Sequence, residues 1–279
     1  MNLADKMTIV ITSHNVECFE KYLYYLLYSL CPSLKACNFL IYYDQCSFDL
    51  DVKDSIIDKI DTVFKKNNIT KYDIHFQNGG LLAAFYNLSK NIKTDYFLFL
   101  EHDWVFLKNP DFFSIIESMD KHEYVKYVAF KKLGNIEKQL NALHDYKKER
   151  IPFVKDSRIK DLDLIQCCYW SNNPFICKTK VMNSWLKIFI TKEIEEKIKT
   201  NTLNRMGSRG VEQVMIRVFC EDVSKYPWSS IKDSWGVFIY GNVGMPPIIA
   251  HTDASNRYDG LPEQLGKEWI EKNKSFIDI

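Results

Sequence analysis

Short apolar runs alternate with helix-like segments through the first hundred residues of this 279-residue chain. The β-branched run 8–12 predicts a buried first strand. The next apolar residues, from Phe19 to Leu30, fall on one helical face that ends before Pro32. Because strands that alternate with helices favour a parallel sheet with crossover helices, the sequence predicts the α/β class.

The same alternation continues along the rest of the chain. Further strands are expected at 38–43, 71–76, 96–100, 125–130, 164–170, 175–177 and 235–240, and helices at 52–66, 79–91, 179–190, 210–221 and 261–274. The polar stretch 132–163 is expected to form a loop or a helix. No internal repeat or low-complexity linker interrupts the pattern, so we expect one domain over residues 1–279.

The composition permits a large core and argues against two classes of protein. Hydrophobic residues make up 46% of the chain, which includes 18 Phe and 16 Tyr. The formal net charge is only +1, whereas nucleic-acid binders usually carry a basic excess, so we expect no nucleic-acid partner. No apolar stretch approaches the roughly 20 residues that span a bilayer, so we expect no transmembrane segment.

The eight cysteines suggest thiols more than metal ligands or disulfides. None lies in the C-x-x-C spacing that is typical of structural zinc sites. The first six residues include Asp5 and Lys6, and the apolar run after them is too short for a secretory signal. We therefore expect free thiols in a cytoplasmic protein, and peripheral contact with a membrane stays open.

Two acids, Glu101 and Asp103, follow the uninterrupted apolar run 96–100. Side chains alternate along a strand, so both carboxylates are expected to project the same way from its carboxyl end. Ligands of open α/β sheets bind at those ends, and carboxylate oxygens suit Mg²⁺ or Mn²⁺ on a diphosphate. The alternative is an ordinary strand end with two solvent-facing acids.

In this setting the sequence resembles the GT-A glycosyltransferases, and among them the inverting glycosyltransferase family 2. The matching segments, in chain order, are Thr12-Ser13-His14-Asn15, Tyr42-Tyr43-Asp44, Asn78-Gly79-Gly80 and Glu101-His102-Asp103. The resemblance implies donor contacts from Thr12, Ser13, Asn15, Asn78, Gly79 and Glu101, and recognition of the base by Asp44. It implies a metal at Asp103, with Glu101 on the ribose or on a metal-bound water. The family's first motif position is usually Asp, so direct metal contact by Glu101 stays open.

The second half of the chain carries a candidate base and a candidate late metal ligand. In this family an acid at the start of a helix is the general base, and Glu212 in Gly210-Val211-Glu212-Gln213 matches it. Asp161 and Asp163 are the alternatives. The resemblance also implies a late metal-ligating histidine, matched by His251, which Asp253 could orient or replace.

Three further residues match less distinctive segments. Arg209 lies in a Gly- and Arg-containing segment that could neutralise a diphosphate, although a solvated turn would look the same. Trp170 and Asn172 lie where the family binds its acceptor, and they are candidates for sugar stacking and hydrogen bonding. A core position for Trp170 is the alternative. His102, between the two acids, is expected to point away from them.

The resemblance implies a GT-A (Rossmann-like) fold, with a mainly parallel central sheet and a smaller acceptor-side sheet. It implies metal-dependent, inverting transfer of a hexose or pentose from a nucleotide-sugar donor, with UDP favoured, to a glycan, lipid-linked or protein acceptor. Residues 1–108 would bind the donor, 109–260 the acceptor, and 261–279 would add a C-terminal helix. The Gln-x-x-Arg-Trp pattern of processive synthases is absent, which favours transfer of single sugars. A nucleotidyltransferase and an inactive sugar-nucleotide or glycan-binding module are the alternatives.

Overall fold

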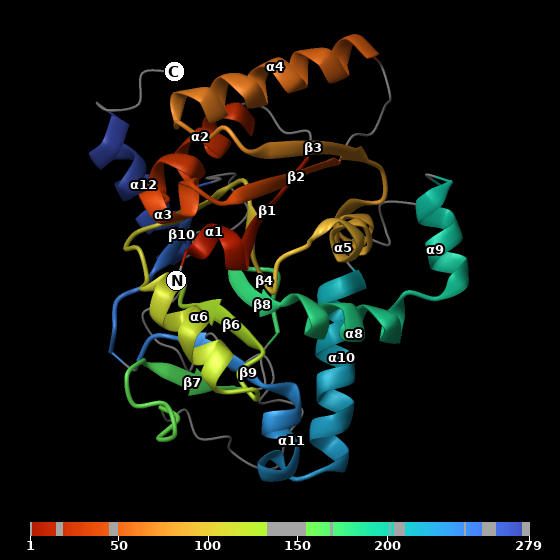
Figure 1. The fold of residues 1–279 in the computed structure, drawn as a ribbon, viewed down its shortest axis with the longest axis vertical. Helices are drawn as coiled ribbons and strands as arrows, with labels where there is room; N and C mark the ends of the chain where they lie inside the picture. Colours follow the sequence, from red (N-terminus) through yellow and green to blue (C-terminus); the bar gives the residue numbers. More distant parts are fainter. Residues whose placement is uncertain are drawn as a thin grey trace.

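A computed structural model describes residues 2–14, 19–44, 50–132, 155–167, 170–200, 202–203, 210–242, 244–252 and 261–274. Within these ranges eight strands form one sheet in the order β3-β2-β1-β4-β8-β6-β9-β7 (Figure 1). The strands are β1 Met7–His14, β2 Asn38–Asp44, β3 Tyr72–Gln77, β4 Tyr96–Glu101, β6 Tyr127–Phe130, β7 Leu164–Gln166, β8 Phe175–Lys178 and β9 Val237–Tyr240. A second sheet pairs β5 Trp104–Phe106 with β10 Ile249–His251.

The order of the strands in the large sheet reverses near its centre. Strands β1 to β4 are mutually parallel, β8 and β7 run antiparallel to their neighbours, and β6 and β9 are parallel to each other. The chain runs outward from β1 through β2 to β3 and then returns to β4 on the other side of β1. The strand order therefore reverses between β1 and β4, and ligands of open α/β sheets bind at such a reversal.

Helices cover both faces of the large sheet. The described helices are α1 Leu3–Lys6, α2 Phe19–Ser29, α3 Pro32–Lys35, α4 Leu50–Lys66, α5 Gly80–Asn91, α6 Phe112–Lys121, α8 Thr179–Phe189, α9 Lys192–Lys199, α10 Gly210–Lys225, α11 Trp228–Trp235 and α12 Leu261–Asn273. Figure 1 shows α4 and α12 on one side of the strands, and α5, α8 and α10 on the other. The molecule thus has three layers.

Two hydrophobic cores follow from the alternation of side chains along the strands. In β4, Leu98 and Leu100 enter the core beneath α2, α4 and α6, whereas Phe97 and Phe99 enter the core beneath α5, α8 and α10. All four side chains are fully buried, and each contributes roughly 1.5–3 kcal/mol to the hydrophobic driving force. A continuous apolar run is therefore what a central strand with two covered faces requires.

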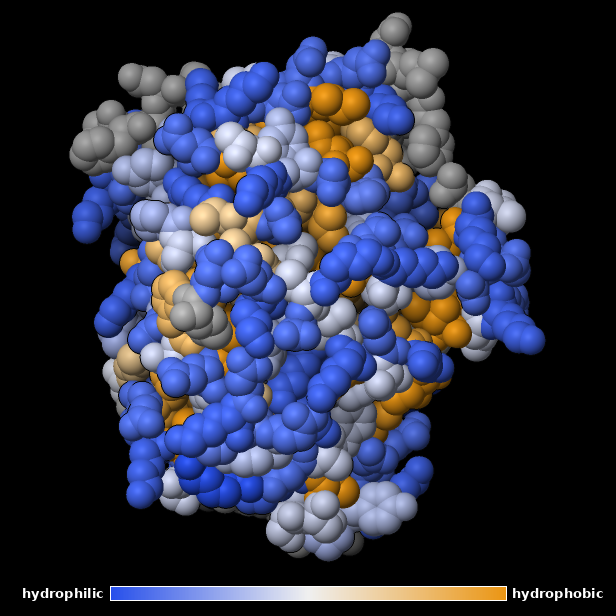
Figure 2. Space-filling view, viewed as in Figure 1, coloured by the Kyte–Doolittle hydropathy of each residue, from blue (hydrophilic) through white to orange (hydrophobic). Residues whose placement is uncertain are grey.

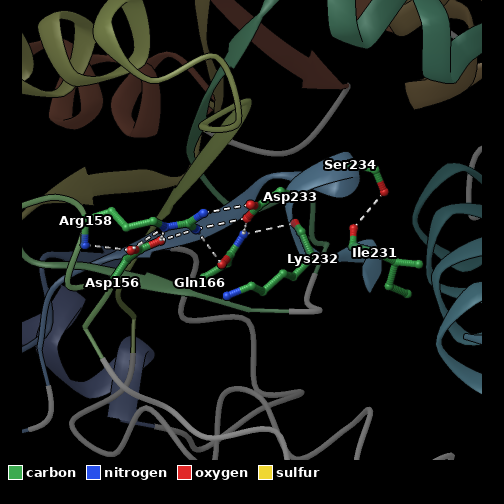
Figure 3. Close-up of polar contacts among 7 residues, drawn as sticks. All are labelled: Asp156, Arg158, Gln166, Ile231, Lys232, Asp233 and Ser234. Atoms are coloured by element: carbon green, nitrogen blue, oxygen red, sulfur yellow. Dashed lines mark hydrogen bonds and ion pairs between the residues drawn. The ribbon is translucent and has the colours of Figure 1, made fainter. Parts of the chain in front are cut away.

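The far edge of the sheet is fixed by an ion-pair network that Figure 3 draws. Arg158 donates to both carboxylate oxygens of Asp156, at 2.9 and 2.6 Å, and to both of Asp233 in α11, at 2.9 and 2.6 Å. Gln166 of β7 joins the network through its own bond to Asp233, at 2.9 Å. The guanidinium lies 3.9 Å over the ring of Tyr124. The network ties the segment before β7 to α11, far along the strand order from β1 and β4.

The fold class predicted from the sequence is confirmed: the central sheet is mainly parallel, helices flank it, and a smaller sheet accompanies it. Most predicted elements differ from the observed ones by one or two residues at an end. The strand predicted over 164–170 was too long, because β7 ends at Gln166 and Trp170 packs in the core. Among the described helices five were not predicted, namely α1, α3, α6, α9 and α11. Of the polar stretch 132–163, residues 133–154 lie outside the described residues.

The remaining observations concern the surface, the helices and the cysteines. Hydrophilic residues cover most of the face in Figure 2, and hydrophobic atoms surface only in narrow patches. Across the described ranges no helix is both long and apolar enough to cross a membrane. The described cysteines Cys31, Cys37, Cys167, Cys177 and Cys220 are free thiols.

Candidate active site

The candidate site is built on the carboxyl ends of β1 and β4. Thr12 pairs with Glu101 in the parallel register, and the backbone N–H of His102 donates to the Thr12 carbonyl at 3.1 Å. Thr12 and Ser13 are buried, and Ser13 Oγ has no hydrogen-bond partner among the described residues. The chain thus places a hydroxyl and the acidic segment side by side at the reversal of strand order.

The small sheet brings His251 to Asp103. The antiparallel register of β5 and β10 sets His251 opposite Trp104, the residue after Asp103. Thr252 donates twice to the Asp103 carbonyl, from its backbone N–H at 2.7 Å and from Oγ1 at 2.9 Å. His251 Nε2 consequently lies 3.0 Å from Asp103 Oδ2, with the two side chains 23% and 13% exposed. Backbone pairing therefore decides where this imidazole lies.

The two acids have opposite electrostatic environments. Burial raises the pKa of Glu101 above its usual value, and the negative charge of Asp103 raises it further. Burial alone would also raise the pKa of Asp103, but the hydrogen bond from His251 and the nearby His102 outweigh burial and hold that pKa below its usual value. Asp103 is therefore the carboxylate of the pair that stays charged, as a ligand for a cation must.

Glu212 also belongs to this group of acids. It lies in the first turn of α10, is half-buried, and its charge is among the causes that raise the pKa of Glu101. The alternative base Asp163 instead pairs with Lys155 at 2.9 Å, beside β7. Asp161 is exposed in the same segment. Glu212 therefore lies near enough to Glu101 for their charges to interact, whereas Asp163 forms an ion pair with Lys155.

Three of the residues predicted to bind the nucleotide, Asp44, Asn78 and Gly79, lie around the start of α5. Asp44 is buried, and its Oδ1 accepts a hydrogen bond from the backbone N–H of Gly80 at 3.1 Å. Gly79 has φ +116°, a conformation that other residues rarely adopt, and Asn78 precedes it, half-buried. Gln77 Nε2 closes the turn with a bond to the Gly80 carbonyl at 3.0 Å. Asp44 therefore already has a structural role at the helix start, in addition to any contact with a base.

On the acceptor side the structure separates Trp170 from Asn172. The Trp170 ring is fully buried among Phe85, Tyr127 and Phe175, so it has no exposed face on which a sugar could stack. Trp170 is a core residue, which is the alternative considered from the sequence. Asn172 is half-buried, and its Oδ1 has no hydrogen-bond partner among the described residues. Only Asn172 therefore keeps a geometry suited to an acceptor contact.

Three of the residues named from the sequence lie outside the described residues: Asn15, Arg209 and Asp253. His102 is buried and makes an edge contact with the ring of His14, whose centroid lies 5.3 Å away.

The ligand chemistry at Asp103 and His251 fits a divalent cation. Asp103 Oδ1 is buried and has no hydrogen-bond partner among the described residues, and a carboxylate and an imidazole are both ligands that Mn²⁺ accepts. No group of three His, Cys, Asp or Glu side chains is gathered for a metal within the part of the chain that the structure describes. Asp103 and His251 would therefore form a two-ligand site that leaves further positions to the diphosphate and water.

Sequence reasoning missed two residues at this site. Trp104 Nε1 donates to Glu101 Oε2 at 3.4 Å, and its ring meets His251 edge-on, with centroids 5.0 Å apart. Thr252 holds the Asp103 carbonyl, as described above. The signal for Trp104 was its place directly after the acidic motif, whereas nothing local in the sequence links Thr252 to Asp103.

The sequence matches no protein-family model and no curated protein. Among solved structures the chain is similar to a mannosyltransferase from Pyrobaculum calidifontis in complex with GDP-Man and Mn²⁺, with 8% identity, a TM-score of 0.45, and coverage of 64% of this chain and 46% of that chain. Mouse xyloside xylosyltransferase 1 has 7% identity, a TM-score of 0.46, and coverage of 91% and 99%. A cytidylyltransferase from Leptospira borgpetersenii has 11% identity, a TM-score of 0.45, and coverage of 98% and 96%. Because glycosyltransferases and a nucleotidyltransferase both occur, the similarity alone does not decide between these activities.

Proposed function

We propose that this chain is a metal-dependent glycosyltransferase of the GT-A type. It transfers a hexose or pentose from a nucleoside-diphosphate sugar to an acceptor hydroxyl, one sugar at a time and with inversion. The donor is a UDP-sugar, and the cation is Mn²⁺ or Mg²⁺. Inversion and the preference for UDP rest on the resemblance to glycosyltransferase family 2.

The observation that carries the proposal is the contact between Asp103 and His251 where the strand order reverses. This contact joins an anionic oxygen and an imidazole at the place where open α/β sheets bind ligands. Glu101 and Glu212 stand close enough for their charges to interact. A site of this kind suits a cation and a diphosphate better than an uncharged substrate.

Each residue has a separate task in the proposed reaction. Asp103 and His251 would hold the cation, and the positive charge of a bound cation would neutralise charge on the leaving nucleoside diphosphate. Glu101 contacts the ribose of the donor or a metal-bound water, and Trp104 orients its carboxyl group. Glu212 takes the proton from the acceptor hydroxyl as that oxygen attacks the anomeric carbon.

The remaining predictions complete the proposal. Thr12, Ser13, Asn15, Asn78, Gly79 and Arg209 contact the donor, Asp44 accepts the N3–H of uracil, and Asn172 binds the acceptor. Residues 1–108 form the donor half, 109–260 the acceptor half and 261–279 a C-terminal helix. The acceptor is a glycan, a lipid-linked sugar or a protein, and the location is the cytoplasm, which suits the free thiols.

A thermal-shift series tests the proposal directly. UDP, GDP and TDP and their common sugar conjugates are each added with Mn²⁺ and, separately, with EDTA. Stabilisation by one nucleotide family only in the presence of Mn²⁺ is the expected result. The nucleoside triphosphates are added in a parallel set, and stabilisation by these alone would point to the nucleotidyltransferase. Donor binding without transfer or donor hydrolysis would point to a binding module, and no shift with any nucleotide would overturn the proposal.

A further inference from the structure

Lys131, the residue after β6, has an ammonium group buried without a carboxylate partner in the described parts of the chain. The side chain is 0% exposed. Its Nζ donates to the Asn242 carbonyl at 2.8 Å and to the Met245 carbonyl. Burial lowers the pKa of Lys131 below its usual value. Burial of a charged group costs free energy unless hydrogen bonds satisfy it. Both carbonyl acceptors of the Lys131 ammonium come from one segment, the connection between β9 and β10.

The backbone of Lys131 holds the end of the same connection. Its carbonyl accepts from Ile248 N–H at 2.7 Å and from Ile249 N–H at 3.3 Å. The start of the connection packs on the lysine stem: a Cβ at Gly241, which has φ +128°, would lie 3.3 Å from Lys131 Cδ. The described parts of 241–249 thus surround one residue.

This arrangement sets the position of His251. Strand β10 begins at Ile249, one of the two residues whose N–H groups reach the Lys131 carbonyl, and it ends at His251. Phe106 of β5 packs on Phe130, the neighbour of Lys131, with ring centroids 5.3 Å apart. Lys131 therefore stands where β6, β5 and the start of β10 meet. The first residue of β10, Ile249, is two residues before His251, whose imidazole contacts Asp103.

We propose that Lys131 is a positioning residue of the active site: its ammonium organises the β9–β10 connection so that His251 is held against Asp103. The catalytic meaning of this inference rests on the proposed function. The positioning itself does not, because it concerns only the contact between His251 and Asp103.

The chain offers a matched control at the opposite edge of the sheet. Lys178, at the end of β8, is also buried, and its Nζ donates to the Glu123 carbonyl at 3.2 Å. Because β8 runs antiparallel to β4, its end lies at the edge away from Glu101. Its Nζ also pairs with the exposed carboxylate of Glu123 at 3.5 Å, a partner that Lys131 lacks among the described residues. Lys178→Met therefore removes a buried ammonium bound to a carbonyl, as Lys131→Met does, but at a place that does not support His251.

The first measurement is the NMR signal of the His251 ring in the metal-free protein, assigned by its loss in His251→Gln. In Lys131→Met we expect the ring signal to move towards that of a solvent-exposed imidazole. In Lys178→Met we expect no change. An unchanged His251 signal in folded Lys131→Met would overturn the proposal, whatever the protein's activity.

The second measurement is Mn²⁺ binding in the presence of UDP, followed by the electron paramagnetic resonance signal of free Mn²⁺. Lys131→Met is expected to weaken binding about tenfold or more, as loss of support around a ligand does, whereas Lys178→Met stays within about twofold. Equal weakening in both variants would reduce Lys131 to a general structural role. A third outcome separates the two proposals. If the wild-type protein binds no Mn²⁺, the metal-dependent function fails. If the His251 signal nevertheless moves in Lys131→Met and not in Lys178→Met, the positioning role of Lys131 stands.

A second variant covers the case in which Lys131→Met does not fold. Gly241→Ala keeps the ammonium but adds a methyl group against the lysine stem at a positive φ. It is expected to move the His251 signal in the same direction. A folded Gly241→Ala protein with an unchanged signal would contradict the proposal.

Discussion

His251 Nε2 lies 3.0 Å from Asp103 Oδ2, and the pairing of β10 with β5 brings the two residues together. The two residues belong to distant parts of the sequence, yet each ends or precedes a three-residue strand of the same small sheet. Since a strand pair fixes its register through backbone hydrogen bonds, the pairing sets which residues lie opposite each other. The carbonyl of Lys131 in turn accepts from the N–H of Ile249, the first residue of β10.

Asp103→Asn should abolish metal-dependent transfer while the fold is kept. The amide has the shape of the carboxylate but lacks the charge that a divalent cation requires, so we expect turnover to fall on the order of 10³-fold. Turnover with Mn²⁺ and the far-UV circular dichroism spectrum measure the two effects. Asp73→Asn, an exposed acid on β3, is the control and should be neutral. Near-normal turnover in Asp103→Asn would exclude a metal ligand at this position.

Glu212→Gln should keep donor binding and lose transfer. A general base typically contributes 10²- to 10⁴-fold to the rate, and the amide cannot accept the acceptor proton. Calorimetric titration of the donor and turnover separate the two properties. The control is Glu221→Gln, an exposed acid on the same helix that faces Lys225 at 4.0 Å. Lost donor binding, or full activity, would move the search for the base to another residue.

The first half of the fold was readable from the sequence because its elements carry complete local signals. Strand β4 is a continuous apolar run, and α4 repeats its apolar residues at helical spacing. Helix α6 was missed although its start has a signal: Asp111 Oδ1 accepts from Ser114 N–H at 3.0 Å, after Pro110. The resemblance implied a smaller sheet, but its strands β5 and β10 were not located by residue, because three-residue strands leave no periodic pattern.

The site was only partly readable for a similar reason. Glu101 and Asp103 can be recognised in the sequence because they follow an apolar run. The contacts of Thr252 and Lys131, in contrast, join segments far apart in the sequence. Trp170 shows that a residue type alone can suggest a wrong role. An aromatic residue can pack in a core or stack on a sugar, and the fully buried Trp170 packs in the core. Likewise the bond from Gly80 to Asp44 is a tertiary contact that no local pattern encodes.

Gly266→Ala should disturb the candidate active site through the packing of α12 on β10. Gly266 lies in α12, and a Cβ there would stand 1.9 Å from the His251 carbonyl oxygen, so the helix must shift away from β10. We expect a loss of about 1–3 kcal/mol of stability, as for other overpacked positions, and weaker stabilisation by UDP with Mn²⁺. Melting temperatures with and without these ligands measure both effects. Gln264→Ala, exposed on the same helix, should change neither.

Arg158→Met should destabilise the fold without touching the active site. The variant leaves Asp156, whose side chain is 6% exposed, buried without its bidentate partner. Because Arg158 and Asp233 are 38% and 44% exposed, we expect a loss of about 2–3 kcal/mol, below that of a fully buried pair. Urea denaturation measures it, with the exposed Lys160→Met as control. Unchanged stability would mean that the network drawn in Figure 3 is replaceable by water.

The same network predicts how this loss depends on pH. Hydrogen bonds from Arg158 lower the pKa of Asp233 to about 2, and they outweigh burial to lower the pKa of Asp156 as well. A carboxyl with a lowered folded-state pKa stabilises the fold above its unfolded value, near 3.9, and this stabilisation is lost as the pH falls towards the folded value. The difference in unfolding free energy between wild type and Arg158→Met should therefore be full at neutral pH and shrink as the pH falls from about 4 towards 2. Urea titrations at successive pH values give this difference directly. A difference that stays constant down to the lowest pH at which the protein folds would mean that packing of the arginine on Tyr124, and not its ion pairs, supplies the stabilisation.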